Sequence, residues 1–202
     1  MKLASENNST MTDPILEKII LEIAKPKIVS TKDVFHDMMS CLIEQQIHYR
    51  STKKIFAKAL ERAGLEHLTL ENFHLLEKHS LSQIKLSMGK YDTILAFIDY
   101  WNNNKVDFFQ LTDEEIASEL SSIKGIGKWT IDMLLLYTLE RPDIFPYDDF
   151  HLKQIMVSLY ELNPNAKLKS QMIEVSKNWG NQKSLAVLYL LAYKEYIKKI
   201  VS

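Results

Sequence analysis

The chain has 202 residues, of which 46% are hydrophobic, so it can bury a core as one large domain or two small ones. Its net charge of −1 is unlike that of a strongly basic nucleic-acid-binding protein, although local lysine clusters still attract phosphates. The single cysteine, Cys41, excludes an internal disulfide and any four-cysteine site. No apolar run reaches the ~18 residues of a membrane span, and the polar start lacks a signal core. These features predict a soluble intracellular protein, in the cytoplasm or nucleoid, or in a nucleus.

After a polar leader at 1–12, apolar residues recur at helical spacing between turns rich in glycine, proline and polar residues. The spacing predicts helices at about 13–24, 34–46, 51–63, 80–101, 112–123, 128–138, 150–160, 168–179 and 185–200. Two of these helices begin with a sequence typical of a capping box, "SLSQ" at Ser80 and "TDEE" at Thr112. Gly64 follows one helix as a stop signal. No segment alternates as a strand does, so we predict an all-α fold.

Two of the chain's five glycines, Gly125 and Gly127, stand on either side of Ile126 between two predicted helices. Glycine permits positive φ and lets another backbone or a phosphate come close. The turn also leads into helix N–H groups that lack partners within the helix and attract anions. A tight helix–helix turn uses glycine for purely structural reasons too. The pair, flanked by Lys124 and Lys128, favours a phosphate-binding hairpin in which Ile126 packs against the core.

Two adjacent carboxylates, Asp148 and Asp149, precede the helix predicted at 150–160. One aspartate at such a place is an ordinary N-cap. Helix geometry suggests that one of the two caps the helix while the other points elsewhere.

These two features together resemble a known signature. The stretches "IKGIGKWTIDMLLLY" and "PDIFPYDDFHLKQ" are similar to the helix-hairpin-helix DNA glycosylase superfamily, and in particular to its 3-methyladenine DNA glycosylases. The stretches "SCLIEQQIHYRSTKKI" and "WGNQKSLAVLYLLAY" resemble two further blocks, so the likeness covers about 34–193. It implies two helical subdomains flanking a cleft. One lies at 31–145 with the hairpin at about 112–138, and the other is discontinuous, at 13–30 and 146–202.

The resemblance implies that Asp149 is the catalytic carboxylate and that Asp148 is the structural, helix-capping one. The chemistry agrees, because breaking the bond between base and deoxyribose develops a sugar cation that a nearby carboxylate stabilises. The damaged base must first be flipped out of the duplex into a pocket.

The resemblance also implies roles for the remaining motif residues. The hairpin, Gly125 to Lys128 with Lys124, would hold backbone phosphates. Gln45 or Gln46, with Gln46 favoured, would fill the space that the flipped base leaves, the alternative being a polar helix end. Trp129 would stack on the base, a contact that suits a cationic, alkylated purine. Tyr189 and Tyr193 would lie behind Trp129, although aromatics at helical spacing belong more often to a core.

The implied partner is double-stranded DNA with damaged bases, bound by a monomer. No cofactor is required, and a Na⁺ or K⁺ ion would be held at the hairpin by the backbone carbonyls of Ser121, Ile123 and Gly125. Lyase-type relatives carry a catalytic lysine where this chain has Trp129. Lys128 lies about 100° away around the helix and should not replace that lysine. We therefore predict a glycosylase without lyase activity.

Three residues depart from the family pattern. Lys183 and Leu191 lie in the C-terminal block, and His48 follows the glutamine motif. Leu191 replaces a common tryptophan, which leaves the breadth of the substrate range open. Two other classes of function also stay open at this point: a helix-hairpin-helix DNA-binding module without catalysis, and an all-α interaction scaffold whose glycine turn is only a turn.

Overall fold

The computed structural model describes residues 12–44, 53–84 and 86–201. Within these ranges the chain forms helices and no strand, so the predicted all-α fold is confirmed. The chain divides into two compact units. The continuous unit is Val29–Leu139, and the discontinuous unit is Met1–Ile28 with Glu140–Ser202. None of the helices in the described ranges has the length and apolar character needed to cross a membrane.

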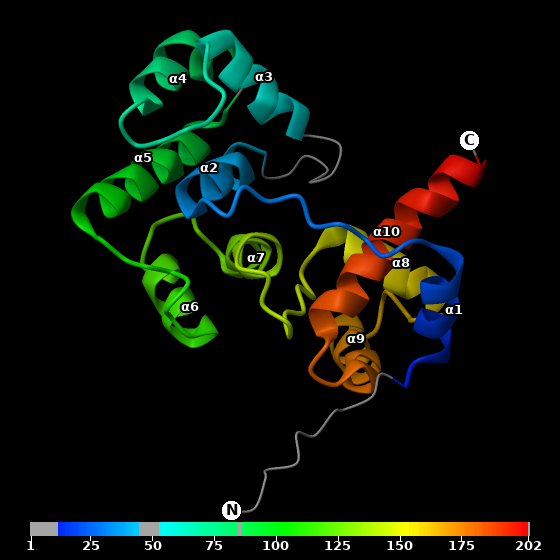
Figure 1. Ribbon diagram of the computed structural model, residues 1–202. Coiled ribbons are helices and arrows are strands. Elements are labelled where there is room, and N and C mark those ends of the chain that lie inside the picture. Colours follow the sequence, from blue (N-terminus) through cyan, green and yellow to red (C-terminus); the bar gives the residue numbers. More distant parts are fainter. Residues whose placement is uncertain (1–11, 45–52, 85, 202) are drawn as a thin grey trace, which may run out of the picture. The chain divides into compact units, whose positions relative to one another are not determined.

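The continuous unit is built around α2, whose central residues are almost all buried. Helix α2 packs against α3, α5, α7 and η2 (Figure 1). The helical elements of this unit are α2 (Val34–Glu44), α3 (Lys53–Ala63), α4 (Phe73–His79), η1 (Leu81–Gln83), α5 (Met88–Asn103), α6 (Asp113–Ser121), α7 (Lys128–Met133) and η2 (Leu134–Thr138). Cys41 of α2 is buried, as expected for a structural thiol, and burial together with the charges of Glu44 and Asp37 raises its pKa to about 12.

Local signals at the ends of these helices were partly correct. The capping box at Thr112 is confirmed, because its hydroxyl accepts from Glu115 N–H while the Glu115 carboxylate accepts from Thr112 N–H. Gly64 ends α3 with φ +68°, as a stop signal should. The capping box predicted at Ser80 is wrong. Ser80 is fully buried and its hydroxyl donates to the carbonyl of Ala59 at 2.7 Å, and only the short 3₁₀ turn η1 follows.

Two elements of the continuous unit were not predicted. Helix α4 is short, and its buried residues Phe73 and Leu76 give too little periodicity to stand out. The second helix of the hairpin changes at Leu134 from an α-helix to the π-helix η2, where Leu139 N–H donates to the carbonyl of Leu134 at 3.0 Å.

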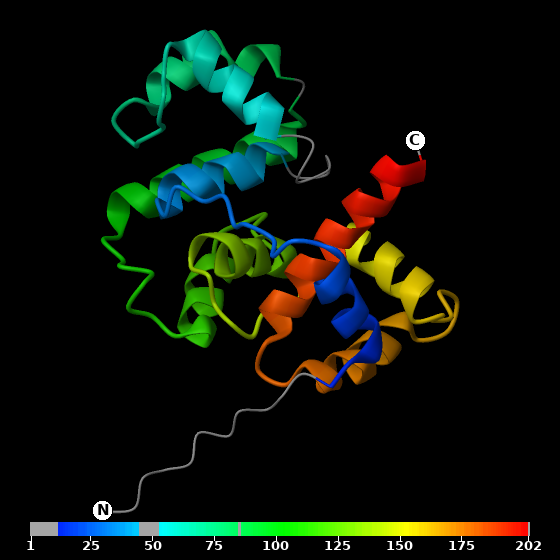
Figure 2. The same ribbon diagram turned by 45° about the vertical axis from the view of Figure 1, so that its right-hand side comes forward.

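The discontinuous unit packs α10 (Lys183–Val201) against both α1 (Pro14–Glu22) and α8 (Phe150–Leu159), as Figure 2 shows. Helix α9 (Leu168–Ser176) continues into the 3₁₀ turn η3 (Lys177–Trp179). Asp13, only 2% exposed, joins distant parts of the chain. One of its oxygens caps α1, and the other accepts from Tyr160 Oη and Trp179 Nε1, both at 2.7 Å. This carboxylate therefore fixes the N-terminal helix to the C-terminal part of the unit.

Candidate functional site

The turn of the hairpin joins α6 to α7, and its first glycine has a structural role. Gly125 has φ +92°, a region that residues with a side chain rarely adopt. A Cβ atom there would lie 2.9 Å from the Cβ of Thr93 on α5, and closer still to the Thr93 hydroxyl. Ile126 is buried, as predicted, and its N–H donates to the carbonyl of Ile123 at 3.1 Å. Gly125 is thus needed to pack the turn against α5.

The second glycine is different. Gly127 has ordinary extended backbone, φ −103° and ψ 174°, and is the N-cap of α7 without any side-chain cap. A Cβ atom on Gly127 would meet nothing within 4 Å. The protein itself does not require glycine at this position, so the open space at the start of α7 is available for a ligand to approach the backbone.

Lys128, predicted to contact DNA, has an acidic neighbour on the same helix. Its Nζ lies 2.7 and 2.6 Å from the two carboxylate oxygens of Asp132, whose side chain is only 7% exposed. A phosphate at the hairpin would share this ammonium group with Asp132. Lys124, on the other side of the turn, is exposed.

Trp129, the predicted stacking residue, is half-buried. It is therefore neither a fully buried core residue nor a fully exposed one. In contrast, Tyr189 is only 6% exposed, which favours the core alternative for this side chain. Tyr193 is half-buried, donates to the Glu22 carboxylate at 3.2 Å and stacks on Tyr196.

The roles assigned to the two adjacent aspartates need a correction. Asp149, and not Asp148, is the N-cap of α8, because its Oδ1 accepts from Leu152 N–H at 2.8 Å. Asp149 is 6% exposed, whereas Asp148 is about half exposed and lies 3.6 Å from Lys153 Nζ. The hydrogen bond from Leu152 N–H holds the Asp149 side chain in a fixed orientation at the start of α8.

Three neighbours of Asp149 were missed by the sequence reasoning. Phe150 is 62% exposed although it is a large aromatic residue, and its ring meets that of His151 edge-on. Lys194 of α10 reaches this helix end, with its Nζ 2.7 Å from His151 Nδ1. Burial lowers the pKa of Lys194, while the charge of Asp149 opposes that shift. Phe150 directly follows Asp149 in the sequence, which is the signal that could have identified it.

The remaining predicted residues are placed as follows. Gln45 and Gln46 lie outside the described residues, as does His48. Glu44, at the end of α2, is 2% exposed and accepts from Phe56 N–H of α3 at 3.1 Å, so it joins the two helices that border the glutamine motif. Lys183, where the family pattern has arginine, pairs with Asp143 at 2.6 Å.

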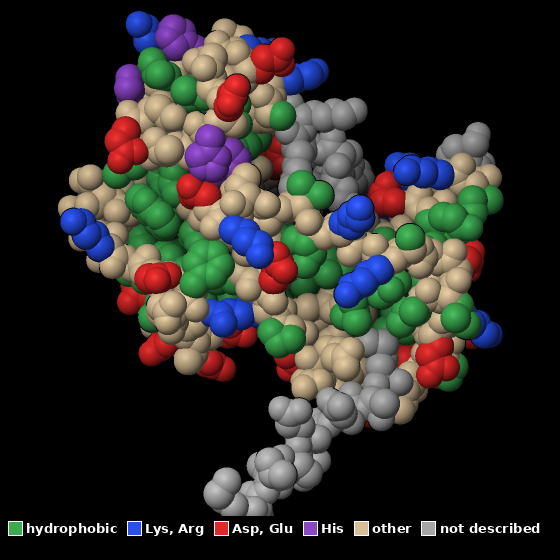
Figure 3. All heavy atoms as spheres, in the orientation of Figure 1, with side chains coloured by type: hydrophobic (Ala, Val, Ile, Leu, Met, Phe, Trp, Pro, Cys, Tyr) green, Lys and Arg blue, Asp and Glu red, His purple; other side chains and the backbone are tan. Residues whose placement is uncertain are grey.

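Figure 3 shows positive and negative side chains mixed over the face that it draws. This mixture agrees with the net charge of −1. Attraction of an anion to such a surface depends on local groups, such as a helix N-terminus and its neighbouring lysines.

The chain is similar to known proteins both in sequence and in fold. No family model matches the chain. It is 24% identical over 181 residues to DNA-3-methyladenine glycosylase 1 of Schizosaccharomyces pombe, covering 87% of this chain and 78% of that protein. It is 25% identical over 191 residues to a DNA-3-methyladenine glycosylase of Bacillus subtilis, covering 88% and 63%. With the B. subtilis protein YfjP the identity is 28% over 184 residues, covering 87% and 64%. The chain therefore spans less than two thirds of these two B. subtilis relatives.

Three solved structures share the fold. A DNA-3-methyladenine glycosidase from Bacillus halodurans has a TM-score of 0.73 at 22% identity, covering 98% of this chain and 95% of that one. S. pombe Mag1, in complex with abasic DNA, has a TM-score of 0.69 at 21% identity, covering 89% and 90%. An 8-oxoguanine glycosylase/lyase of Clostridium acetobutylicum has a TM-score of 0.73 at 21% identity, covering 92% and 67%. These structures show the shared fold, and the relatives found by sequence confirm the resemblance inferred from the motifs.

Proposed function

We propose that this chain, as a member of the helix-hairpin-helix DNA glycosylase superfamily, is a monofunctional glycosylase that flips alkylated purines out of double-stranded DNA and hydrolyses their bond to deoxyribose. The observation that carries the proposal is Asp149, a buried carboxylate held at the start of α8 within a glycosylase fold. The named relatives favour a glycosylase over a DNA-binding module without catalysis or a scaffold.

In the proposed reaction Asp149 stabilises the sugar cation that develops as the base departs, or aligns the attacking water. The N-cap hydrogen bond keeps the carboxylate in place, so no reorganisation is needed in the transition state. An alkylated purine already carries a positive charge and is a good leaving group. A strong general acid is therefore not required for bases of the 3-methyladenine and 7-methylguanine type.

The hairpin provides the proposed DNA anchor. The open space beside Gly127 supports close approach of a phosphate to the first N–H groups of α7. The proposed Na⁺ or K⁺ ion would bind the carbonyls of Ser121, Ile123 and Gly125. The Ile123 carbonyl accepts one hydrogen bond, from Ile126 N–H, and a carbonyl oxygen has two lone pairs, so that bond by itself does not exclude a cation at this oxygen. Bound there, the ion would supply positive charge for phosphate binding.

Trp129 is the proposed stacking residue for the base, and Phe150 is a second candidate because it is exposed next to Asp149. The lyase branch needs an amine at the position of Trp129. The ammonium of Lys128 is instead bound by Asp132, which supports base release without strand cleavage.

The experiment that tests the function is incubation of the purified protein with methylated duplex DNA, followed by chromatography of the released bases. Release of 3-methyladenine and 7-methylguanine supports the proposal. Binding of the DNA without any base release would indicate a DNA-binding module without catalysis. If salt-dependent DNA binding is absent too, the interaction scaffold is the remaining alternative.

A pair of isosteric substitutions tests the catalytic carboxylate. Asp149→Asn keeps an oxygen that can accept from Leu152 N–H, because asparagine also caps helices well, but it removes the charge. We expect single-turnover base release to fall at least ~100-fold, the size of effect that removal of one charge-stabilising group has in other enzymes. The matched control, Asp148→Asn, changes an exposed aspartate and should retain activity. The assignment is wrong if Asp148→Asn is the more damaging change.

A further inference from the structure

A lysine of α10 reaches the end of α8 that carries Asp149. Lys194 Nζ lies 2.7 Å from His151 Nδ1 and also donates to Gln154 Oε1, so it contacts the first two turns of α8. The same Nζ lies over the Phe150 ring, 5.8 Å from the ring centre. Helix α10 therefore places a positive charge against the two residues that directly follow Asp149.

The groups that hold Lys194 are uncharged. An ammonium group has hydrogens to donate and no lone pair, so the His151 nitrogen accepts, as a neutral imidazole can. The second acceptor is the amide oxygen of Gln154. In the part of the chain that the structure describes, no carboxylate pairs with Lys194. Other lysines have an acidic partner, namely Lys128 with Asp132, Lys153 with Asp148, Lys177 with Glu174 and Lys183 with Asp143.

The position of Lys194 disfavours its positive charge, and an anion would offset that effect. Burial lowers the pKa of Lys194, the charges of Asp149 and Glu195 oppose the shift, and the charge of Lys198 adds to it. Since its contacts are with neutral groups, the ammonium keeps its attraction for an anion that approaches from solvent. An ammonium also has three hydrogens, and His151 and Gln154 take two of them.

Joining the two helices does not by itself account for this residue. Helix α10 packs against α8 (Figure 1), and both helices bury apolar side chains, among them Leu152 and Met156 of α8 and Val187 and Leu190 of α10. An unbranched apolar side chain at position 194 could cover the same surface. The property of Lys194 that packing leaves unexplained is its charge.

We propose that Lys194 binds a DNA phosphodiester, that of the nucleotide whose base is flipped. This inference rests on the proposed function, in which Asp149 acts on the deoxyribose of that nucleotide. The phosphates of the nucleotide are bonded to the same sugar, and Lys194 reaches the end of α8 that Asp149 caps. A phosphate oxygen there accepts a charge-assisted hydrogen bond from the ammonium. Unlike a contact of the hairpin backbone, this one forms only when the nucleotide has left the duplex.

The test measures binding to duplex DNA with and without an abasic site over a range of salt concentrations. Lys194→Met keeps a long side chain and removes the charge. We expect its affinity for the abasic duplex to fall roughly tenfold, the effect of one lost hydrogen bond between charged groups, with affinity for undamaged DNA unchanged. For the abasic duplex, the slope of log affinity against log salt should become shallower by about 0.9, because one fewer phosphate is neutralised.

Two variants serve as controls. Lys194→Arg retains the charge and should bind the abasic duplex nearly as tightly as wild type does. Lys199→Met removes an exposed lysine of the same helix and changes the net charge by the same amount, so it should leave the salt slope unchanged. Melting temperatures, measured on each variant, separate a loss of stability from a loss of binding. If Lys194→Met does not fold, Lys194→Gln takes its place.

Three results would overturn the inference: an unchanged salt slope in Lys194→Met, an equal loss of affinity for undamaged DNA, or the same loss in Lys199→Met. Base release by the wild-type protein distinguishes this inference from the proposed function. If wild type releases no base, the proposed function fails and the phosphate contact fails with it. If wild type releases base while Lys194→Met binds the abasic duplex normally, only the phosphate contact is wrong.

Discussion

At the scale of single residues, the two possible roles of Trp129, stacking on the flipped base or packing in the core, predict different effects of its substitution. It follows the anchoring turn directly and is half-buried. A stacked base contributes roughly 1–3 kcal/mol, and a cationic base on indole gains more. Trp129→Ala should therefore slow release of 3-methyladenine much more than it weakens binding to abasic DNA, which has no base to stack. Single-turnover release and abasic-DNA affinity, measured on the same variant, check this expectation.

A second tryptophan of the continuous unit supplies the control. Trp101 is also half-buried, but it stacks on Phe108 with ring centroids 5.9 Å apart and packs on Phe35. Trp101→Ala should lower the melting temperature without changing release at low temperature. If Trp129→Ala behaves like Trp101→Ala, losing several degrees of stability but no activity, Trp129 belongs to the core.

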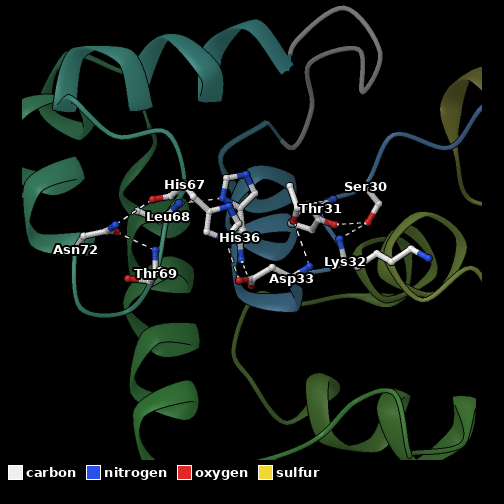
Figure 4. A network of polar contacts seen from close by, with 10 residues as sticks. Ser30, Thr31, Lys32, Asp33, His36, His67, Leu68, Thr69 and Asn72 are labelled. Carbon is white, nitrogen blue, oxygen red and sulfur yellow. Dashed lines mark hydrogen bonds and ion pairs between the residues drawn. The ribbon is translucent and has the colours of Figure 1, made fainter.

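Asp33, which caps α2 (Figure 4), makes the stability of the folded protein depend on pH. Burial by itself raises the pKa of Asp33, but hydrogen bonds from His36 N–H and the His67 ring outweigh it, so the pKa lies below the ordinary value of 3.8. A depressed pKa stabilises the folded state above the unfolded-state value, and this stability is lost as pH falls through the folded-state value. Asp33→Asn keeps the cap on α2 and removes the charge. Its free energy of unfolding should fall below that of wild type at pH 6 and converge with it below pH 3.8. Denaturant titrations at several pH values test this, and a constant difference would contradict it.

At the scale of elements, substitutions of the two hairpin glycines should affect different properties, folding for Gly125 and DNA binding for Gly127. Gly127→Val places a side chain in open space, so the protein should still fold, with only the modest loss of stability that valine causes at a helix N-cap. The same side chain would block a phosphate, and we expect weaker binding to damaged and undamaged DNA alike, because phosphates carry no sequence information. Gly125→Ala, the comparison variant, should destabilise the fold because its Cβ would collide with Thr93. Normal DNA binding by Gly127→Val would remove the hairpin backbone from the mechanism.

The sequence could predict the elements whose signals are local. The glycine hairpin, the stop at Gly64 and the capping box at Thr112 depend on residues within one turn of each other. The capping box at Ser80 failed because a tertiary partner, the carbonyl of Ala59, takes the serine hydroxyl. The π-helix η2 has no local sequence signal.

The same distinction between local sequence signals and tertiary contacts applies to the candidate site. The motif identified the pair Asp148 and Asp149, but which one caps α8 depends on where the helix begins, and a shift of one residue rotates a side chain by about 100°. Lys194 could not be predicted at this helix end, because its contact with His151 joins α10 to α8 across 43 positions of the sequence.

At the scale of the whole molecule, the reaction should stop at an abasic strand. A fold shared with an 8-oxoguanine glycosylase/lyase does not decide this, because lyase chemistry needs a suitably placed amine. With Trp129 at the family's lysine position and Lys128 bound to Asp132, borohydride treatment during turnover should trap no covalent protein–DNA adduct. An authentic bifunctional glycosylase serves as the positive control. An adduct that disappears in Lys128→Ala would refute the prediction.

The buried contacts of Asp13 have a consequence for synthesis on the ribosome. Its partner Tyr160 lies 147 residues away and Trp179 lies 166 residues away, so helix α1 cannot dock until almost the whole chain has been translated. The continuous unit has no such dependence, since all of its residues emerge in one run. We expect the continuous unit to fold first, while α1 remains undocked with its apolar face exposed. Nascent chains that stall before Trp179 should therefore bind chaperones.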